Sequence, residues 1–435
     1  MLTVVLVGYI AWKISQSGDQ ALQFAFNGLS VGAVYALVAM GFTLVYSTVW
    51  FFDLYYGAAA ALGAYGVFYL RSSDVLYTRF DVNNIFVNVV FAAVVAGVAA
   101  WTLYVSVYPR LRGRVNSTVL LAAGALLAGG AGVYTGFVLS YPDKLNVMLS
   151  PAVGVLAAIA AGWALYQGCR RALPGAGPVP FLVLAAIVAA IPGVICGYLV
   201  SNAPGSSLYL SWGVSCLLAG CVGLALYRGL YVYMRQRSRS PLIMLVASLG
   251  VLLGLTAFIS IVFASAPRPL PAPFGSDSWS VAGAFIKGFN VFTIGVALTA
   301  FVGLLLFLRK TAFGKAVRAI GDDEEVSKVV GINTTVIISA VFFIGAVFAA
   351  LAGLLSGHDS AIQPRMGLLL LLKGWIASVM GGIGNLYGAI VGGFALGMIE
   401  QFGIWDLAGE WKDAISFIIL ILFLSFWPKG LLPRR

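Results

Sequence analysis

Apolar runs of about 20 residues divide this sequence, and runs of that length decide which folds are open to it. Lipid offers no partners for backbone N–H and C=O groups, so a chain crosses a bilayer only as helices or as a closed β-barrel. Barrel strands are shorter segments of about 10 residues with alternating hydrophobicity. The sequence therefore predicts an all-α fold, a polytopic transmembrane helical bundle.

We expect about 12 to 14 spans or part-spans. The first segment is short for a crossing, and the pair near 367–402 is a candidate re-entrant hairpin. No long linker separates the runs, so residues 1–435 are expected to form a single transmembrane domain. The candidate spans are 2–14, 24–48, 54–70, 85–108, 118–140, 147–168, 180–200, 208–233, 242–265, 288–308, 335–357, 367–382, 387–402 and 413–427.

Composition excludes several classes of protein. The chain is 61% hydrophobic and 9% charged, whereas soluble domains carry roughly 25% charged residues. A net charge of +11 would suit nucleic acid, but the basic residues lie in short loops between spans, where they set orientation. His358 is the single histidine and no Cys-x-x-Cys spacing occurs. We therefore expect no nucleic-acid partner, no metal site, no cofactor and no catalytic residues.

Basic clusters predict the orientation of the chain in the membrane. With the spans given above, all five clusters fall on one side, which the positive-inside rule makes the cytoplasmic side. Segment 309–334 and the C-terminus are then cytoplasmic. The clusters are Arg110, Arg112 and Arg114; Arg170 and Arg171; Arg235, Arg237 and Arg239; Arg309, Lys310, Lys315, Arg318 and Lys328; and Lys429, Arg434 and Arg435.

One compact charged segment, "GKAVRAIGDDEEVSKVVGINT" from Gly314 to Thr334, interrupts the apolar runs. We expect a helix over 312–320 that ends at Gly321. Asp322 would then N-cap a second short helix, with Glu325 completing a pattern like a capping box. Gly331 is the expected C-terminal stop.

The second short helix of this segment is expected to carry one apolar edge, made of Val326, Val329 and Val330. A helix that rests on lipid usually carries Lys and Arg across its polar face, and the acids at 322–325 would be repelled by anionic headgroups. The pattern favours a docking element for a soluble partner over a surface helix lying on the membrane.

The same segment resembles the cytoplasmic coupling segment of branched-chain amino acid ABC-transporter permeases of the LivH type. Further resemblance lies in "FAFNGLSVGAVYALVAMGFTLVYS", "GAAAALGAYG" and "KGWIASVMGGIGNLYGAIVGGFALGMIEQF". The resemblance covers roughly 23–70 and 221–430. The chain departs from the family in residues 71–220, which hold extra inserted spans, and at Asp53-Leu54-Tyr55-Tyr56-Gly57, where the family commonly has Asn-Phe-Ala-His-Gly.

The resemblance implies a cell inner membrane permease subunit that translocates branched-chain amino acids. A soluble ATPase would dock on the cytoplasmic coupling segment 309–334, a second permease subunit, homologous or identical, would complete the pathway, and an extracytoplasmic binding protein would deliver the cargo. Gly314-Lys315 lacks the earlier glycine of a phosphate loop, so ATP hydrolysis is expected on a partner chain. The expected coupling residues are Gly314, Arg318, Asp322, Asp323, Glu324, Glu325, Val326, Val329, Gly331 and Asn333.

Candidate residues of the translocation pathway each have a structural alternative. Asp53 and Tyr56 fall at the departure from the family pattern, and Asp53 could equally cap the following helix. Lys373 is expected to snorkel rather than contact a substrate carboxylate or a lipid headgroup, and Glu400 is expected to be interfacial. Gly382, Gly384 and Asn385 would line a turn near the pathway, although glycines spaced by four also suit helix packing.

Rival functions stay open at this point. The same machinery could carry urea, short amides or another small polar solute. An ATP-independent secondary transporter or channel would need more intramembrane ionisable residues than Asp53, Lys373 and Glu400. A membrane-embedded enzyme is disfavoured by the single histidine.

Overall fold

The computed structural model describes residues 17–71, 85–111, 116–172, 178–202, 206–237, 240–270, 278–281, 283–427 and 430–432. The expected first span at 2–14 lies outside the described residues. So do several of the basic residues used for orientation: Arg112, Arg114, Arg239, Lys429, Arg434 and Arg435.

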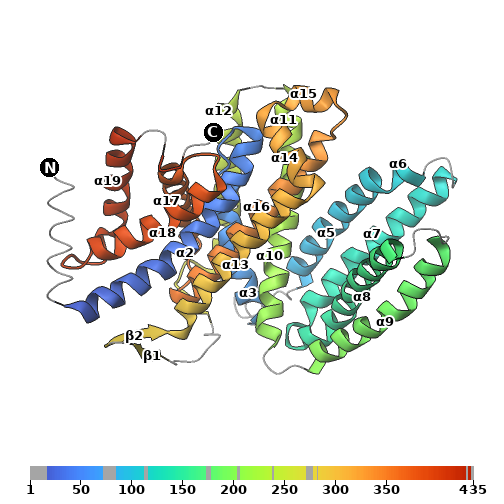
Figure 1. The fold of residues 1–435 in the computed structure, drawn as a ribbon, viewed down its shortest axis with the longest axis horizontal. Helices are drawn as coiled ribbons and strands as arrows, with labels where there is room; N and C mark the ends of the chain where they lie inside the picture. Colours follow the sequence, from blue (N-terminus) through green and yellow to red (C-terminus); the bar gives the residue numbers. More distant parts are fainter. Residues whose placement is uncertain are drawn as a thin grey trace. The chain divides into compact units, whose positions relative to one another are not determined.

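Nearly every described element is a helix, which confirms the all-α fold class (Figure 1). Eight described helices are long and apolar enough to cross a membrane, and three further apolar helices are shorter. The main helices are α2 (Gly18–Val49), α3 (Tyr55–Arg71), α5 (Ile85–Ser106), α7 (Ser117–Ser140), α8 (Leu145–Ala172), α9 (Pro178–Asn202), α10 (Ser206–Leu226), α12 (Pro241–Phe263), α13 (Gly288–Lys310), α16 (Thr334–Asp359), α17 (Met366–Gly381), α18 (Leu386–Gly403) and α19 (Trp411–Phe426).

Shorter helical pieces connect these helices. A π-helix, η2 (Tyr227–Tyr231), lies between α10 and α11 (Val232–Arg237), and α14 (Ala312–Asp322) and α15 (Glu324–Val329) lie between α13 and α16. The others are α6 (Tyr108–Leu111) and the 3-10 turn η1 (Pro142–Lys144). The chain divides into two compact units, one of residues 1–66, 105–109 and 215–435 and the other of residues 67–104 and 110–214.

Helix α2 is the most deeply buried candidate span of the first unit, and it packs against α13, α16, α17 and α18. Glycines allow these helices to approach closely. A Cβ added at Gly397 of α18 would overlap the carbonyl oxygen of Gly28 in α2. Gly392 of α18 meets Ala377 of α17 in the same way. The glycine spacing in α18 therefore serves helix packing, as small residues do in lipid.

A short antiparallel hairpin is an exception to the helical prediction within the described residues. Strands β1 (Ser278–Val281) and β2 (Ala284–Lys287) pair Ser278 with Lys287, and the turn between them contains Gly283 at φ 84°. The backbone N–H of Phe285 donates to Gln23 Oε1 at 2.8 Å, which ties the hairpin to the start of α2. The hairpin precedes α13, so it marks the end of that helix opposite to α14 (Figure 1).

The second unit holds α7, α8, α9 and most of α5, and it covers nearly the residues expected to be an insertion. Helices α8 and α9 pack through Gly154 and Gly193, where an added Cβ on either glycine would meet the carbonyl oxygen of the other at 2.8 Å. Tyr69 donates to Asn88 Oδ1 at 2.8 Å, and Asn88 donates to Ser140 Oγ at 3.1 Å. Close backbone packing and buried amide hydrogen bonds join the helices of this unit.

Candidate functional site

The charged segment forms two short helices between the ends of α13 and α16, and each helix start has a side-chain cap. Thr311 Oγ1 accepts from the N–H of Gly314 at 3.2 Å, and Asn333 Oδ1 accepts from Val336 at 3.3 Å. The cap of α15 differs from the sequence prediction. Helix α14 continues through Gly321 and Asp322, and Asp323 Oδ1 accepts from the N–H of Val326 at 3.0 Å.

The predicted N-cap of α15 was therefore wrong by one residue, and α14 ends two residues later than predicted. The physical reason is that Gly321 is buried inside the last turn of α14 at negative φ, so it does not break the helix. With Asp323 as the N-cap, Glu325 is not positioned to complete a capping box.

Gly331 ends α15 as predicted. Its φ is 91°, a left-handed conformation that favours glycine. The N–H of Gly331 donates to the Lys328 carbonyl at 3.0 Å and the N–H of Ile332 donates to the Ser327 carbonyl at 3.0 Å. This pair of bonds is a Schellman motif, which satisfies the last carbonyls of the helix and fixes the direction of the chain into α16.

Gly314 holds the first turn of α14 against the end of α13. A Cβ at this position would overlap the Leu308 carbonyl oxygen, so only glycine allows the close approach. Val317 and Ile320 are buried on the same face of α14, whereas Arg318 is exposed. Helix α14 is thus amphipathic, and its apolar face is fixed to the bundle.

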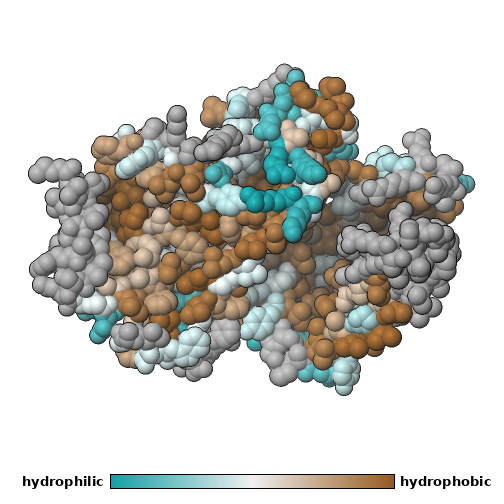
Figure 2. Space-filling view, in the orientation of Figure 1, coloured by the Kyte–Doolittle hydropathy of each residue, from teal (hydrophilic) through white to brown (hydrophobic). Residues whose placement is uncertain are grey.

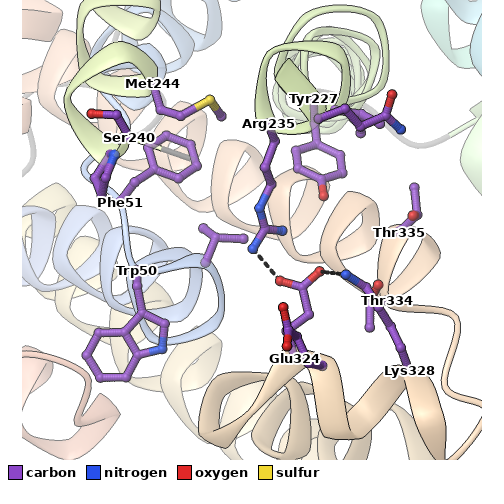
Figure 3. Close-up of a pocket in the computed structure, with 15 residues that line it drawn as sticks. Trp50, Phe51, Tyr227, Arg235, Ser240, Met244, Glu324, Lys328, Thr334 and Thr335 are labelled. Carbon is purple, nitrogen blue, oxygen red and sulfur yellow. Dashed lines mark hydrogen bonds and ion pairs between the residues drawn. The ribbon is translucent and has the colours of Figure 1, made fainter. Parts of the chain in front are cut away.

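Glu324 is held by two bases of the chain itself (Figure 3). Arg235 of α11 pairs with Glu324 Oε2, and Lys328 Nζ lies 2.8 Å from Glu324 Oε1. Partial burial raises the pKa of Glu324, but the hydrogen bond from Lys328 and the charge of Arg235 outweigh burial, so the net shift is downward. Glu324 is thereby an ionised internal contact between the coupling segment and α11.

The remaining face of α15 is exposed and apolar. Val326, Val329 and Val330 are 58%, 88% and 75% exposed, and Glu325 is exposed beside them. Figure 2 shows hydrophilic surface gathered around α14 and a hydrophobic surface at α15. Isolated exposed valines are ordinary, but a cluster of three on one six-residue helix and its cap is typical of an interaction site.

A cavity of about 500 Å³ lies behind the coupling segment (Figure 3). It is lined by the end of α2, by α11, by the starts of α12 and α16, and by Glu324, Glu325 and Lys328 of α15. Trp50 lines it as well, and the Trp50 indole N–H donates to the Gly321 carbonyl at 3.1 Å. The connection after α2 therefore contacts α14 directly.

Asp53 lies on the same connection and is fully buried. Its Oδ1 accepts from the N–H of Tyr55 at 3.0 Å and from the Tyr231 hydroxyl at 2.8 Å, while Oδ2 has no hydrogen-bond partner among the described residues. The contact with Tyr55 is the helix cap that the sequence offered as one alternative. Tyr56 is buried with its ring against Gly345 of α16.

Lys373 and Glu400 form an ion-paired cluster inside the protein. Glu400 is 0% exposed and Lys373 is 14% exposed. Lys373 Nζ lies 3.2 Å from Glu400 Oε1 and 2.9 Å from Asp413 Oδ1, and Tyr35 donates to Glu400 Oε2 at 2.7 Å. Ser416 also donates to Glu400. The cluster joins α2, α17, α18 and α19, and its ion pairs and hydrogen bonds offset the cost of burying the Glu400 carboxylate.

Gly382, Gly384 and Asn385 form the tight turn between α17 and α18. Both glycines have positive φ, 112° and 84°, and Asn385 Oδ1 caps α18 by accepting from Tyr387 at 3.0 Å. The Asn385 amide also donates to the Leu432 carbonyl at 2.8 Å, so residues near the C-terminus hold this turn.

The structure brings the coupling residues together but separates the pathway candidates. The Arg309 guanidinium of α13 lies 5.4 Å from the centroid of the Tyr387 ring. Tyr387 is next to the turn, so the turn lies at the end of the bundle that carries the coupling segment, which we call the coupling end. Asp53 lies at that end too, beside the residues that line the cavity behind α15. Lys373 instead reaches toward the first turn of α19 at Asp413.

Sequence reasoning missed the ion-pair partners of Glu324 and of the Lys373–Glu400 cluster. Arg235 was counted only as a base that sets orientation, and Asp413 was not singled out. The signal that could have found Glu400 was its position inside an apolar run, since a carboxylate there needs a cation. No local signal indicated Arg235, which is 89 positions away from Glu324.

Residues 119–424 match the family described as branched-chain amino acid transport system / permease component. The chain belongs to this family. The permease LivH of Salmonella typhimurium is 34% identical over 224 residues, 50% of this chain and 72% of the relative. LivH of Escherichia coli K12 is 32% identical over 262 residues, which cover 59% of this chain and 81% of the relative. BraD of Pseudomonas aeruginosa is 33% identical over 229 residues, which cover 52% of this chain and 74% of the relative.

More distant relatives have other names, a fructose import permease of Rhizobium meliloti and an autoinducer 2 import permease of Yersinia enterocolitica. No solved structure matches the chain. Family membership makes the chain a multi-pass ABC-importer permease that is not itself catalytic, and such a component works with an ATPase and a binding protein. The ATP-independent transporter, the channel and the membrane enzyme are thereby set aside.

Proposed function

We propose that the chain is a permease subunit for branched-chain amino acids in the cell inner membrane. The names of the more similar relatives support this cargo, since LivH and BraD are both called high-affinity branched-chain amino acid permeases. The match covers 36% of the relative named for fructose and 62% of the relative named for autoinducer 2, against 72% of LivH of Salmonella typhimurium and 74% of BraD. The departure at 53–57 keeps urea and short amides as cargoes to test.

The ATPase is proposed to dock on the coupling segment, through the exposed valines of α15. The observation that carries this proposal is the combination of an exposed apolar cluster, Val326, Val329 and Val330, with a helix fixed at both ends by Asp323 and Gly331. Closure of the ATPases would push α15 sideways. The caps at Thr311 and Asn333 join the short helices to α13 and α16, which would carry that displacement as rigid bodies.

In this proposal the coupling segment and the C-terminus are cytoplasmic. The binding protein would then approach the opposite end of the first unit, where the β1–β2 hairpin and the start of α19 lie. A second permease subunit, homologous or identical, would complete the pathway. Basic residues of the described chain at the coupling end, such as Arg235, Arg309 and Lys315, support this orientation.

The double variant Val329→Asp with Glu325→Lys tests the docking role. Val329→Asp places a charge in the apolar cluster, and Glu325→Lys reverses the exposed charge beside that cluster. Neither change removes a partner of the Glu324 ion pairs. Mild purification of the tagged variant should recover the permease without the ATPase, and ATP-driven L-leucine uptake should fall by more than about tenfold. The matched control is Lys144→Glu, an exposed charge reversal in the second unit, outside both proposed docking surfaces.

An ATPase that co-purifies with the double variant, together with normal uptake, would contradict the docking role. The cargo is tested separately by competition against L-leucine uptake. Inhibition by L-valine and L-isoleucine, with none by fructose, urea or acetamide, is the expected result. Inhibition by urea or acetamide alone would move the cargo to the amide class.

A further inference from the structure

A second, smaller cavity of about 190 Å³ lies in the first unit, between α2, α13, α16, α18 and α19. Its lining includes Asp359 in the last turn of α16 and Lys412 in the first turn of α19. Helix α16 begins at the coupling segment and ends here, so the cavity lies at the opposite end of the bundle. It is smaller than the roughly 300–1,000 Å³ typical of drug-sized ligands, which suits a molecule the size of one amino acid.

The two charged residues of this cavity are not used by the fold. Within the described chain, neither Asp359 nor Lys412 forms an ion pair, whereas Lys373, Glu400 and Asp413 close by are ion-paired with one another. A single carboxylate and a single ammonium on one small cavity match a ligand that carries one charge of each sign. A free α-amino acid is such a ligand, and charge-assisted hydrogen bonds are the stronger kind.

The uncharged lining fits the same ligand. Val31, Val34 and Leu355 give an apolar surface for a branched side chain. Thr293 is buried and donates its hydroxyl to the Phe289 carbonyl at 2.9 Å, and Ser360 donates to the Ser356 carbonyl at 2.9 Å. Because both hydroxyl protons are used by the helices, any further hydrogen bond to these oxygens is one that they accept, which favours an ammonium group.

One wall of the cavity is held in place by the buried charge cluster. Tyr35 lines the cavity, donates to Glu400 at 2.7 Å and accepts from Lys373 Nζ at 3.1 Å. Gln401, which also lines the cavity, is buried next to Glu400 in sequence. A wall fixed in this way lowers the ordering that a ligand must impose when it binds.

We propose that this cavity is an α-amino acid subsite of the translocation pathway, in which Asp359 faces the ligand's ammonium group and Lys412 its carboxylate. The apolar lining then accepts the side chain. The inference rests on the proposed amino acid transport, and it adds where and by which groups the cargo is held after the binding protein releases it. The site recognises the zwitterionic head group and leaves the choice among branched side chains to the apolar lining.

Equilibrium binding of radiolabelled L-leucine to the assembled transporter in lipid nanodiscs, without the binding protein, tests the subsite. The competitors are leucinamide, which lacks the carboxylate, and 4-methylpentanoate, which lacks the amine. Asp359→Asn should weaken L-leucine and leucinamide by about tenfold or more and leave 4-methylpentanoate unchanged. Lys412→Gln should weaken L-leucine and 4-methylpentanoate by a similar factor and leave leucinamide unchanged. Glu410→Gln, an exposed acid outside the cavity, is the matched control and should bind as wild type.

The same preparation is assayed for ATP-driven uptake with the binding protein added, which separates the two proposals. Two outcomes would overturn the subsite and leave the proposed function standing. In one, L-leucine is taken up and neither variant changes its binding. In the other, L-leucine is taken up but no binding is measured. Binding that depends on Asp359 and Lys412, without any ATP-driven uptake, would support the subsite and contradict the proposed function. Loss of both ligand classes in both variants would also overturn the assignment of one charge to each group.

Discussion

The first unit contains two three-residue ionic clusters, each with a glutamate paired to a base, and their surroundings give them different roles. In the cluster of Lys373, Glu400 and Asp413, Glu400 is 0% exposed. In the cluster of Arg235, Glu324 and Lys328, Glu324 is 17% exposed and Lys328 56%. Water screens the second cluster, whereas in the first it reaches Asp413, which is 49% exposed, but not the Lys373–Glu400 pair. The buried cluster therefore joins four helices, whereas the exposed one positions a segment that moves in the proposed mechanism.

The largest effect is expected from Lys373→Met, which leaves the Glu400 carboxylate buried without its cation. Removing one partner of a buried pair destabilises by about 3–5 kcal/mol. Thermal unfolding of the purified protein measures the change. Adding Glu400→Gln to the same chain should recover part of the loss, and a double variant as unstable as the sum of both singles would show that the pair is not coupled.

A smaller effect is expected from Arg235→Met. Glu324 keeps Lys328 and contact with water, so the loss of stability should be about 1 kcal/mol. ATP-driven uptake should fall by more than this change in stability accounts for, because the coupling segment loses its contact with α11. If uptake and stability fell in proportion, the pair would be structural only, and the comparison between the clusters would fail.

Lys328→Met should change stability by only about 0.3–0.5 kcal/mol, the usual size of an exposed pair spaced by four residues on a helix. The same measurement of thermal unfolding applies. This variant is also the matched control for Arg235→Met, since each removes one of the two bases that face Glu324. A loss as large as that of Lys373→Met would mean that water does not screen the exposed cluster.

The smallest effect is a pH dependence that belongs to Glu324 alone. Its pKa is lowered in the folded protein, so its ionisation stabilises the fold above the ordinary glutamate pKa of about 4.3, and that contribution is lost as the pH falls below it. The difference in unfolding free energy between wild type and Glu324→Gln should be constant from about pH 7 to 5.5 and should narrow toward pH 4 and below. A difference that widened on acidification would contradict the sign.

Local rules predicted the parts of the fold and site that depend on neighbours in sequence. The apolar runs predicted helices, Gly331 predicted the end of α15, and the glycine spacing in α18 predicted its packing. The N-cap of α15 was predicted at Asp322 but lies at Asp323. Tertiary burial of Gly321 keeps α14 intact at that point, and no local pattern shows this burial.

Contacts between distant segments could not be predicted in this way. Glu324 meets Arg235 only because α11 and α15 are brought to the same cavity, and Glu400 meets Lys373 only through the α17–α18 packing. The β1–β2 hairpin was missed because four-residue strands beside Gly283 leave a weak alternation. The pairing partner of a charge depends on topology rather than on local sequence.

Trp50 has a left-handed backbone at φ 56°, which is uncommon for a residue other than glycine. Glycine at this position would relieve strain of roughly 1 kcal/mol, yet it would delete the indole that reaches the Gly321 carbonyl. That hydrogen bond contributes about 1 kcal/mol, so the strain and the contact nearly cancel in the stability of the fold. In the proposed mechanism, Trp50→Gly would therefore loosen the link between α2 and α14 with little change in thermostability.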